Sequence, residues 1–122
     1  YSLARPDYYF SFESIGEQPE FTEEQAISIF RIIQESLSNS IKYSNAINYE
    51  VVLEGGKTDS GYKICLIIED DGVGFELDSI RPGIGLLSLK ERAYSLNGDI
   101  NIASKPGEGT KVVLEAVIPL NQ

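Results

Sequence analysis

The chain has 122 residues, of which 42 % are hydrophobic and 24 % are charged, a composition typical of one globular domain with room for a hydrophobic core. Its net charge of −9, from 19 acidic and 10 basic residues, disfavours binding to a nucleic-acid backbone, and no basic stripe offsets that charge. No run of residues approaches the roughly 18 apolar residues needed to cross a membrane, and the first residues lack the pattern of a signal peptide.

Two residue types limit the chemistry further. Cys65 is the only cysteine, so neither an internal disulfide nor a cysteine metal cluster can form, and its place in the apolar run KICLIIE predicts a buried side chain. Histidine is absent, which excludes a histidine triad, a histidine metal site and a histidine phosphoacceptor within this chain. Because the chain lacks methionine and begins at Tyr1, we expect it to be part of a longer protein.

The first third of the chain predicts a strand and a long helix. The aromatic segment 7–14 alternates loosely, as strands do. Thr22 and Gln25 have the spacing of a capping box, which predicts the start of a helix that ends near Ser44. Apolar side chains recur along this helix at three- and four-residue steps and are expected to form its buried stripe: Ala26, Ile29, Phe30, Ile33, Leu37 and Ile41.

The remainder predicts two hairpins separated by a second helix. Segments 47–54 and 62–69 are strand-like and are joined by the turn-rich GGKTDSG. LLSLKERAYSL is helical and stops at Asn97 and Gly98, and segments 99–104 and 110–118 are two more alternating strands. The order strand, helix, two strands, helix, two strands predicts an α+β fold, a two-layer α/β sandwich with helices on one face of a mixed sheet. No Walker or G-x-G-x-x-G pattern occurs, which disfavours a doubly wound nucleotide fold.

One polar constellation lies on the long helix. Glu35, Asn39 and Lys42 follow at four- and three-residue steps, so they share a face, and that face is expected to point away from the buried stripe. A solvated polar surface is one interpretation. The other is phosphoryl-transfer chemistry, because an amide oxygen can coordinate Mg²⁺, an ammonium can neutralise phosphate and a carboxylate can accept a proton.

Glycine-rich loops form a second constellation. Asp70-Asp71-Gly72-Val73-Gly74 leaves a strand, Gly83-Ile84-Gly85-Leu86 enters a helix and GEGT ends at Thr110. Each is compatible with an ordinary turn. Glycines at a helix entry also offer unpaired N–H donors that can hold phosphate. An EF-hand is excluded, because its glutamate at the twelfth position is replaced by Arg81.

Together these motifs resemble the ATP-binding catalytic domain of bacterial sensor histidine kinases, within the class shared with gyrase, Hsp90 and MutL. FRIIQESLSNSIKYS resembles the N box, DDGVGF the G1 box, GIGL the G2 box and GEGT the last glycine box. The resemblance covers residues 21–119 and implies the Bergerat ATP-binding fold, with residues 1–122 forming a single ATP-binding domain.

The resemblance implies a role for each motif residue. Asn39 would bind the Mg²⁺ that bridges the ATP phosphates, and Glu35 lies where the wider class places its general base. Asp70 would accept a hydrogen bond from the adenine amino group. Further nucleotide contacts are implied for the residues that flank these groups: Lys42 and Tyr43 on the helix, Gly72, Val73 and Gly74 beside the base, Gly83, Gly85 and Leu86 at the lid and phosphates, and Thr110 at the adenine end.

The subtype follows from the short segment Phe75–Pro82 between the two glycine boxes. A long lid does not fit there, so the chain resembles the short-lid kinases that pair with LuxR-type response regulators. The phosphoacceptor histidine is then expected on a dimerisation domain N-terminal to Tyr1, and this domain alone is expected to be a cytoplasmic monomer that does not phosphorylate itself. Two alternatives remain open: an anti-sigma-type protein-serine kinase of the same fold, and a non-catalytic ATP-sensing module.

Overall fold

The computed structural model describes residues 9–43, 48–72, 86–104, 107 and 109–119, with the side chains of Lys42, Tyr43 and Leu86 outside this description. Seven elements follow one another in the predicted order: β1 (Tyr9–Gly16), α1 (Glu23–Tyr43), β2 (Asn48–Lys57), β3 (Gly61–Asp70), α2 (Leu86–Ser95), β4 (Gly98–Ser104) and β5 (Thr110–Pro119). The boundaries lie within a few residues of those expected from periodicity and capping.

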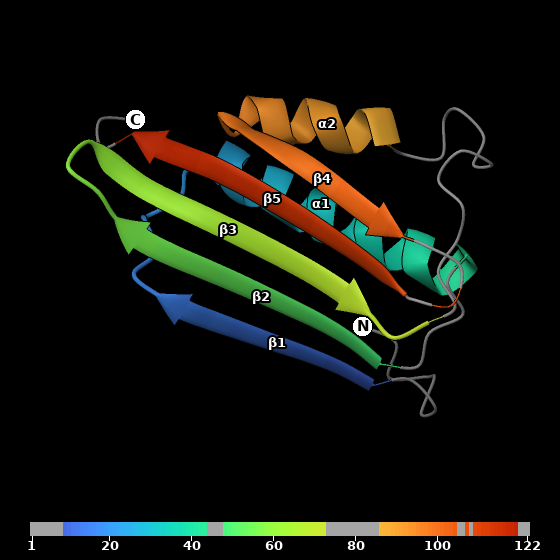
Figure 1. Cartoon of the computed structure of the whole chain (residues 1–122). Coiled ribbons are helices and arrows are strands. Elements are labelled where there is room, and N and C mark those ends of the chain that lie inside the picture. Colours follow the sequence, from blue (N-terminus) through green and yellow to red (C-terminus); the bar gives the residue numbers. More distant parts are fainter. Residues whose placement is uncertain (1–8, 44–47, 73–85, 105–106, 108, 120–122) are drawn as a thin grey trace.

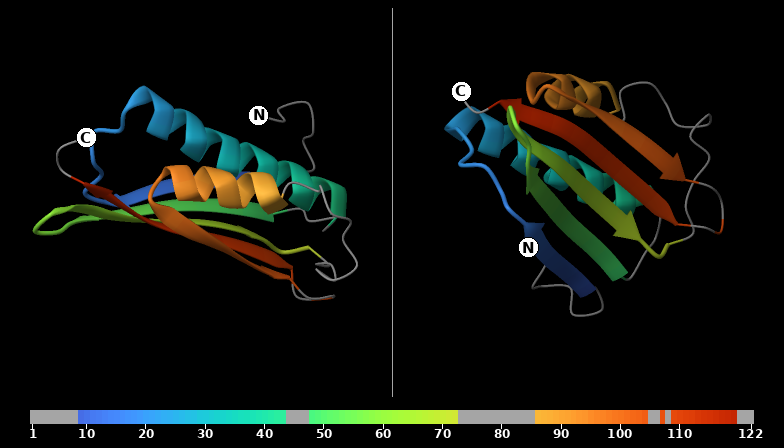
Figure 2. Two further views of the ribbon diagram at one scale, coloured as in Figure 1. Left: turned by 90° about the horizontal axis from the view of Figure 1, so that it is seen from above. Right: turned by 60° about the vertical axis from the view of Figure 1, so that its left-hand side comes forward.

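The strands form one mixed sheet in the order β1-β2-β3-β5-β4. β1 is parallel to β2, whereas the other three pairs are antiparallel. Both helices cover the same face of this sheet (Figures 1 and 2). The predicted α+β sandwich is therefore confirmed, and the opposite face of the sheet carries no helix of the described chain.

Alternation along the strands divides side chains between these two faces. In β3, Ile64, Leu66 and Ile68 are buried, whereas the residues between them are exposed or half-buried. The core lies between the sheet and the helix layer, where apolar side chains are shielded from water on both sides. Its largest fully buried side chains come from both helices, the turn after α2 and four strands: Tyr49, Ile32, Ile64, Leu66, Leu89, Leu96, Ile100 and Leu114.

The long helix begins as its sequence predicts. Gln25 N donates to Thr22 Oγ1 at 3.1 Å, and Thr22 N donates to Gln25 Oε1 at 2.9 Å. This reciprocal capping box satisfies two N–H groups that the first turn of a helix leaves unpaired.

The predicted buried stripe of α1 needs a correction. Phe30 is 59 % exposed and Ala26 is exposed as well, so the true buried face is rotated away from them. It contains Ile29 and Leu37, as predicted, and Ile32. Three polar residues, which an apolar pattern cannot identify, complete it: Gln25, Ser36 and Ser40.

The second helix ends at Ser95, and the chain turns at Asn97, where the sequence predicts the stop. Asn97 has a φ of 60°, and its N–H bonds the carbonyl of Tyr94 at 3.0 Å. Asparagine tolerates this left-handed conformation better than most residues. The side chain then donates Nδ2 to the carbonyl of Val117 at 3.1 Å, which fastens the helix end to β5.

Cys65 departs from the expectation of a buried side chain. It is half-buried and lies on the face of β3 that the helices leave open, between the buried neighbours Ile64 and Leu66. An apolar run in the sequence does not distinguish a central strand covered on one face from a strand covered on both.

Candidate functional site

Four segments far apart in the sequence meet at one end of the sandwich. The C-terminal ends of α1 and β3 and the N-terminal ends of α2 and β5 all lie there (Figure 1). β3 places Asp70 at its last position, directly opposite Thr110 at the first position of β5. The G1 aspartate and the threonine of the last glycine box are therefore neighbours through strand pairing.

Asp70 is a buried carboxylate, 6 % exposed, whose orientation is set by donors from three segments. Its Oδ1 accepts from Gly72 N at 2.8 Å and from Thr110 N at 3.2 Å. Its Oδ2 accepts from the hydroxyl of Ser40 on α1. Buried carboxylates require such donors because losing water is costly for a charged group, so the side chain is a fixed hydrogen-bond acceptor.

The last glycine box packs directly against this carboxylate. Gly109 has a φ of 75°, and a Cβ placed there would lie 2.4 Å from the backbone oxygen of Asp70. Both facts demand glycine at this position. The next residue, Thr110, is also buried, and its Oγ1 shares a hydrogen bond of 2.9 Å with Ser104 Oγ.

Asp71, the second aspartate of the loop, has a different environment. It is exposed, and its carboxylate accepts from Asn48 N at 2.9 Å and from Asn48 Nδ2 at 2.6 Å. These bonds join the ends of β2 and β3. Asp71 therefore belongs to the strand ends, whereas Asp70 faces the helix layer.

Glu35 lies between the two helices. Its Oε1 accepts from Ser88 Oγ at 3.2 Å and from Arg92 Nε at 3.3 Å, both on α2. Its Oε2 is buried and has no hydrogen-bond partner among the described residues. The expectation that this face of α1 points away from the buried stripe is therefore wrong: Glu35 follows Ile32 by three residues, about 60° around the helix, and borders the buried face.

The other predicted site residues have less structural detail. Asn39 is half-buried one turn after Glu35. Gly72 lies beside Asp70 through its bond to Oδ1. For Lys42, Tyr43 and Leu86 the structure places only the backbone in α1 and α2, and Val73, Gly74, Gly83 and Gly85 lie outside the described residues.

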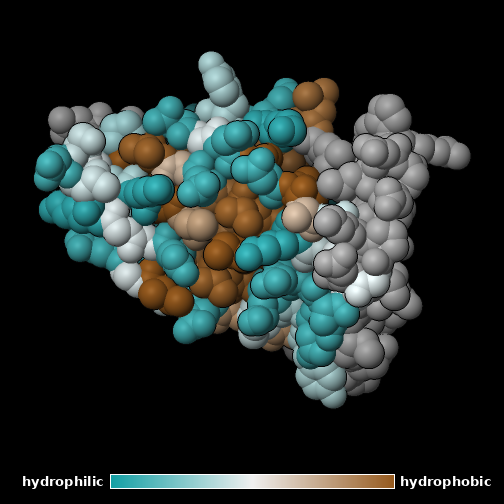
Figure 3. All heavy atoms as spheres, viewed as in Figure 1, coloured by the Kyte–Doolittle hydropathy of each residue, from teal (hydrophilic) through white to brown (hydrophobic). Residues whose placement is uncertain are grey.

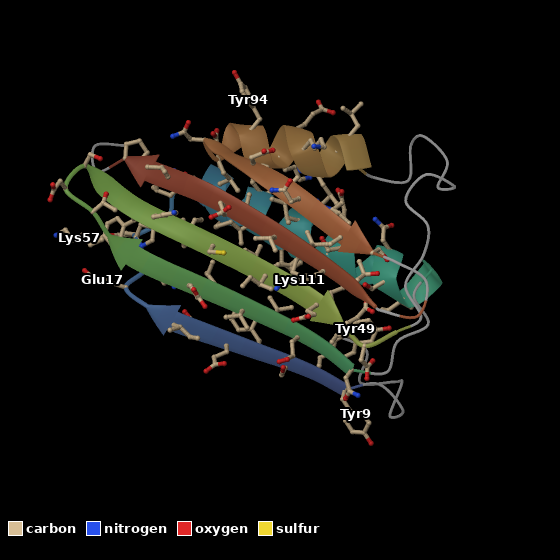
Figure 4. All side chains as sticks on the ribbon, in the orientation of Figure 1. Tyr9, Glu17, Tyr49, Lys57, Tyr94 and Lys111 are labelled. Carbon is tan, nitrogen blue, oxygen red and sulfur yellow. The ribbon has the colours of Figure 1, made fainter. Side chains whose placement is uncertain are left out.

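A pocket of about 660 Å³ lies at the same end of the sheet, lined by the first residues of β1 and β2 and the end of β3. Tyr9 and Tyr49 mark this end (Figure 4). Asp70 lines the pocket, but Glu35 and Asn39 do not. Because Glu50, Glu69 and Asp71 also line it, it repels phosphate and is not by itself a complete nucleotide site.

The structure adds residues that sequence patterns did not identify. Ser40 contacts Asp70, and Ser88 and Arg92 hold Glu35. The sequence contains one signal for Ser40, since small polar residues are unusual within the buried side of a long helix. Nothing local to α2 indicates that Arg92 pairs with a residue of α1.

Fold and site together define a class: an α+β domain in which an N-box helix, a G1 aspartate and a last glycine box converge at one end of the sheet. Residues 24–122 match the family described as "Histidine kinase-, DNA gyrase B-, and HSP90-like ATPase". The chain belongs to this family, and it is an ATP-binding domain of the histidine-kinase type.

Its relatives narrow the class. The chain is 34 % identical over 111 residues to the "Signal transduction histidine-protein kinase/phosphatase DegS" of Brevibacillus brevis, covering 90 % of this chain and 28 % of that protein. It is 35 % identical over 98 residues to the "Signal transduction histidine-protein kinase/phosphatase UhpB" of Salmonella typhimurium, covering 80 % and 19 %. The chain thus spans less than a third of the length of these relatives.

Solved structures agree on the fold. The "Histidine kinase domain from Erythrobacter litoralis EL346 blue-light activated histidine kinase" superposes with a TM-score of 0.66 at 22 % identity, covering 93 % of this chain and 56 % of that one. The "Acinetobacter baumannii histidine kinase AdeS" gives a TM-score of 0.63 at 18 % identity, covering 95 % and 56 %. Within the described ranges, neither helix is long and apolar enough to cross a membrane.

Proposed function

We propose that this domain binds Mg-ATP and positions the γ-phosphate for transfer to a histidine on a separate dimerisation domain of its parent kinase. The observation that carries the proposal is the buried carboxylate of Asp70, oriented by Ser40, Gly72 and Thr110 in a chain of the histidine-kinase ATPase family. Most of the rate in such transfers comes from positioning and from neutralising charge.

Asp70 would recognise the adenine base through a hydrogen bond. A carboxylate accepts hydrogen bonds only, so it pairs with the exocyclic amine of adenine. Guanine has a carbonyl at that position, and two acceptors facing one another repel. The orientation of Asp70 therefore supports selection of ATP over GTP, with Gly72, Val73 and Gly74 letting the backbone approach the base.

Asn39 would hold the metal ion that accompanies the phosphates. The amide oxygen is a hard ligand, and Mg²⁺ in proteins is usually bound by one or two side chains together with phosphate oxygens and water. No group of three or more acidic, cysteine or histidine side chains that could hold a metal occurs in the described part of the chain. A single amide oxygen from the protein fits a Mg²⁺ ion that arrives bound to ATP. Such an ion would neutralise charge at the phosphates.

The remaining predicted contacts would complete the site. Lys42, three residues after Asn39, would approach phosphate, and Tyr43 would line the nucleotide pocket. Gly83, Gly85 and Leu86 would offer N–H donors to the phosphates. Glu35, with one oxygen held by Arg92 and Ser88 and the other unpaired among the described residues, would accept a proton or orient the acceptor.

The partners follow from the class of relatives. We expect a dimerisation domain carrying the phosphoacceptor histidine, and beyond it a LuxR-type response regulator that receives the phosphoryl group. ATP and such regulators are cytoplasmic, which places this domain on that side of any membrane anchor of the parent protein. The domain alone has no histidine and is expected to be a monomer that binds ATP without phosphorylating itself.

Asp70→Asn tests the base contact. The amide can still accept from Gly72 N and Thr110 N, so the fold survives, but its NH₂ group faces the adenine amine with a donor. We expect affinity for a non-hydrolysable ATP analogue with Mg²⁺ to fall roughly 100-fold, about 3 kcal/mol, in a calorimetric titration. Unchanged affinity in a folded variant would overturn the assignment of Asp70.

Asn39→Ala tests the metal contact. Removing the amide oxygen should weaken binding of the ATP analogue roughly tenfold in the presence of Mg²⁺, about 1.4 kcal/mol, and much less in the presence of EDTA. The two titrations are compared directly with those of the unsubstituted domain. Equal losses with and without Mg²⁺ would contradict a metal-binding role for Asn39.

The chemistry of the acceptor separates the histidine kinase from the anti-sigma-type serine kinase. Phosphohistidine is lost in acid, whereas phosphoserine survives. We expect radiolabel transferred from ATP to an added acceptor domain to disappear on acid treatment. Acid-stable label would favour the serine kinase, and absence of any transfer by a domain that binds ATP would favour a sensing module.

A further inference from the structure

The sheet face opposite the helices carries an apolar patch surrounded by polar residues. Figure 3 looks onto this open face, and hydrophobic side chains gather in its centre with hydrophilic ones around them. Exposed apolar patches with a polar rim mark interaction surfaces in soluble proteins. The register of the strands identifies the residues that form it.

Three aliphatic side chains lie in one row across the centre of the open face. Val52 of β2 pairs with Ile67 of β3, which in turn pairs with Val113 of β5. All three are half-buried. We name this row the aliphatic band (Val52, Ile67, Val113). It runs across the strands, perpendicular to their direction.

Carboxylates lie on both sides of the aliphatic band. Two residues along the strands in one direction, Glu50 pairs directly with Glu69. Two residues in the other direction lie Glu54 and the directly paired Glu115 and Asp99. Like charges placed opposite one another on a sheet are destabilising, and none of these five side chains has an ion pair among the described residues. Glu69 also lies opposite Lys111 of β5, which offsets part of the repulsion in the first pair. A cationic partner would relieve the remaining repulsion, above all between Glu115 and Asp99.

The field at this face is negative. Only two lysines share it on the same strands, Lys63 and Lys111, and the latter is labelled in Figure 4. Cys65, which lies between Glu54 and Glu115 in one of the acidic rows, responds to that field. Burial raises the pKa of its thiol, and the two glutamates raise it further.

The dimensions of the patch match one kind of partner. The two acidic rows are four residues apart along each strand, roughly 13 Å, and an α-helix with its side chains is about 10–12 Å wide. The aliphatic band spans three strands, about 10 Å between the outer two, which is close to two turns of a helix. A helix lying along the band would place its flanking side chains over the acidic rows.

We propose that the open face of the sheet binds a basic amphipathic helix of a partner protein, whose apolar side contacts the aliphatic band and whose lysines and arginines contact the acidic rows. Charge selects this partner over the alternatives. A second copy of this chain carries the same net charge of −9, and nucleic acids and anionic lipids are repelled by the same carboxylates. The inference is independent of the nucleotide site, which lies on the helix side of the sheet.

The test uses a fluorescent peptide of about 14 residues made of leucine and lysine, with leucines at helical spacing. We expect saturable binding that weakens with salt, with amide shifts confined to β2, β3, β4 and β5 in NMR spectra. Ile67→Thr and Val113→Thr keep β propensity and should each weaken binding roughly tenfold. Glu54→Gln combined with Glu115→Gln should weaken it several-fold and reduce its salt dependence.

Matched controls lie on the helix layer. Ile27 on α1 is 48 % exposed and Glu91 on α2 is exposed as well. Ile27→Thr and Glu91→Gln should leave peptide affinity unchanged, and thermal unfolding verifies that every variant is folded. ATP-analogue binding, measured in parallel, should be the same in all of them.

Three results would overturn the proposal. Equal loss of affinity in Ile27→Thr and Ile67→Thr would mean that the peptide binds elsewhere or without specificity. Equal binding of a control peptide with serine in place of leucine would reduce the interaction to charge alone. Dimerisation in sedimentation experiments that Val113→Thr abolishes would assign the face to a second copy of this chain.

Discussion

At the scale of single residues, the central feature is a carboxylate whose donors come from separate parts of the chain. Ser40 belongs to α1, Gly72 follows β3 and Thr110 begins β5. Such a carboxylate cannot rotate without breaking hydrogen bonds to three segments. Its orientation is therefore established before any ligand arrives, and preorganisation of this kind lowers the entropic cost of binding.

Ser40→Ala tests how much of that orientation comes from the helix. Removing the hydroxyl deprives a buried carboxylate oxygen of a donor, which should destabilise the domain by about 1–3 kcal/mol in urea unfolding. Affinity for the ATP analogue should also fall, by roughly threefold to tenfold, about 0.6–1.4 kcal/mol, because the carboxylate gains freedom.

Ser36 provides the matched control for this substitution. It lies one turn earlier on α1, is buried to the same degree (3 % exposed against 4 %), and its Oγ has no hydrogen-bond partner among the described residues. Ser36→Ala should therefore be neutral or slightly stabilising. If the two variants lose equal stability and affinity, the bond between Ser40 and Asp70 has no special role.

At the scale of elements, α1 combines a well-defined start with a buried face that is partly polar. The capping box satisfies its first turn. The same turn carries Glu23 and Glu24, whose negative charges interact favourably with the positive end of the helix dipole. Farther along, the helix contacts α2 through Glu35 and Arg92. Because both side chains of this pair are partly exposed, its contribution to stability is expected to be small, and its importance lies in orienting Glu35.

Thr22→Ala tests the capping box as a unit. Losing the side-chain acceptor leaves Gln25 N without its partner, so we expect a loss of about 1 kcal/mol in the free energy of unfolding. Gln25→Ala should be coupled to it in a double-mutant cycle, since the two bonds are reciprocal. The control Thr58→Ala, in an exposed turn with no described side-chain hydrogen bond, should change the free energy of unfolding by less than about 0.5 kcal/mol. If the effects of Thr22→Ala and Gln25→Ala are simply additive, the two hydrogen bonds do not act as a capping box.

At the scale of the whole molecule, the sheet separates the two proposed binding sites. Its inner face supports the core and, at one end, the residues proposed to bind the nucleotide. Its outer face has no helix over it in the described chain (Figure 2). This face carries the aliphatic band between two acidic rows, and Figure 3 shows hydrophobic side chains at its centre. The strand order brings carboxylates from β2, β3, β4 and β5 to this outer face, so its charge is a property of the assembled sheet.

The pKa of the Cys65 thiol depends on the negative charge of the outer sheet face. Burial and the carboxylates of Glu115 and Glu54 raise the pKa of the thiol, and the thiolate is the reactive form. The rate of alkylation by iodoacetamide should therefore rise at higher pH than for a free cysteine, and Glu115→Gln should move the profile to lower pH. Glu91→Gln on α2 is the control and should leave the profile unchanged; an identical shift in both would mean that the local field is not the cause.

The same shift affects stability in a defined direction. The unfolded chain loses the thiol proton at a lower pH than the folded domain does. The contribution of the protonated thiol to the free energy of unfolding is therefore complete below the ordinary thiol pKa. It is lost as pH rises through the raised pKa of the folded state. Cys65→Ser should remove this alkaline dependence.

Much of the fold was predictable because its signals are local. The capping box at Thr22, the stop at Asn97 and the alternating strands depend on neighbours within a few residues, and all three were confirmed. The apolar pattern of α1 was misleading at Phe30, because a partly polar buried face displaces the centre of the stripe. For Cys65, the apolar run did not indicate which face of the strand would be covered.

The sequence by itself determined the order and limits of the elements and the identity of the motif residues, because helix periodicity, capping and glycine loops act over short distances. Tertiary structure alone decided that Ser40 donates to Asp70, that Arg92 meets Glu35, and that carboxylates from four strands line one face. The first two contacts join residues 30 or more positions apart in the sequence. The rows of carboxylates arise from the pairing of the strands in the sheet. No local pattern encodes which distant partners come together when the core is buried.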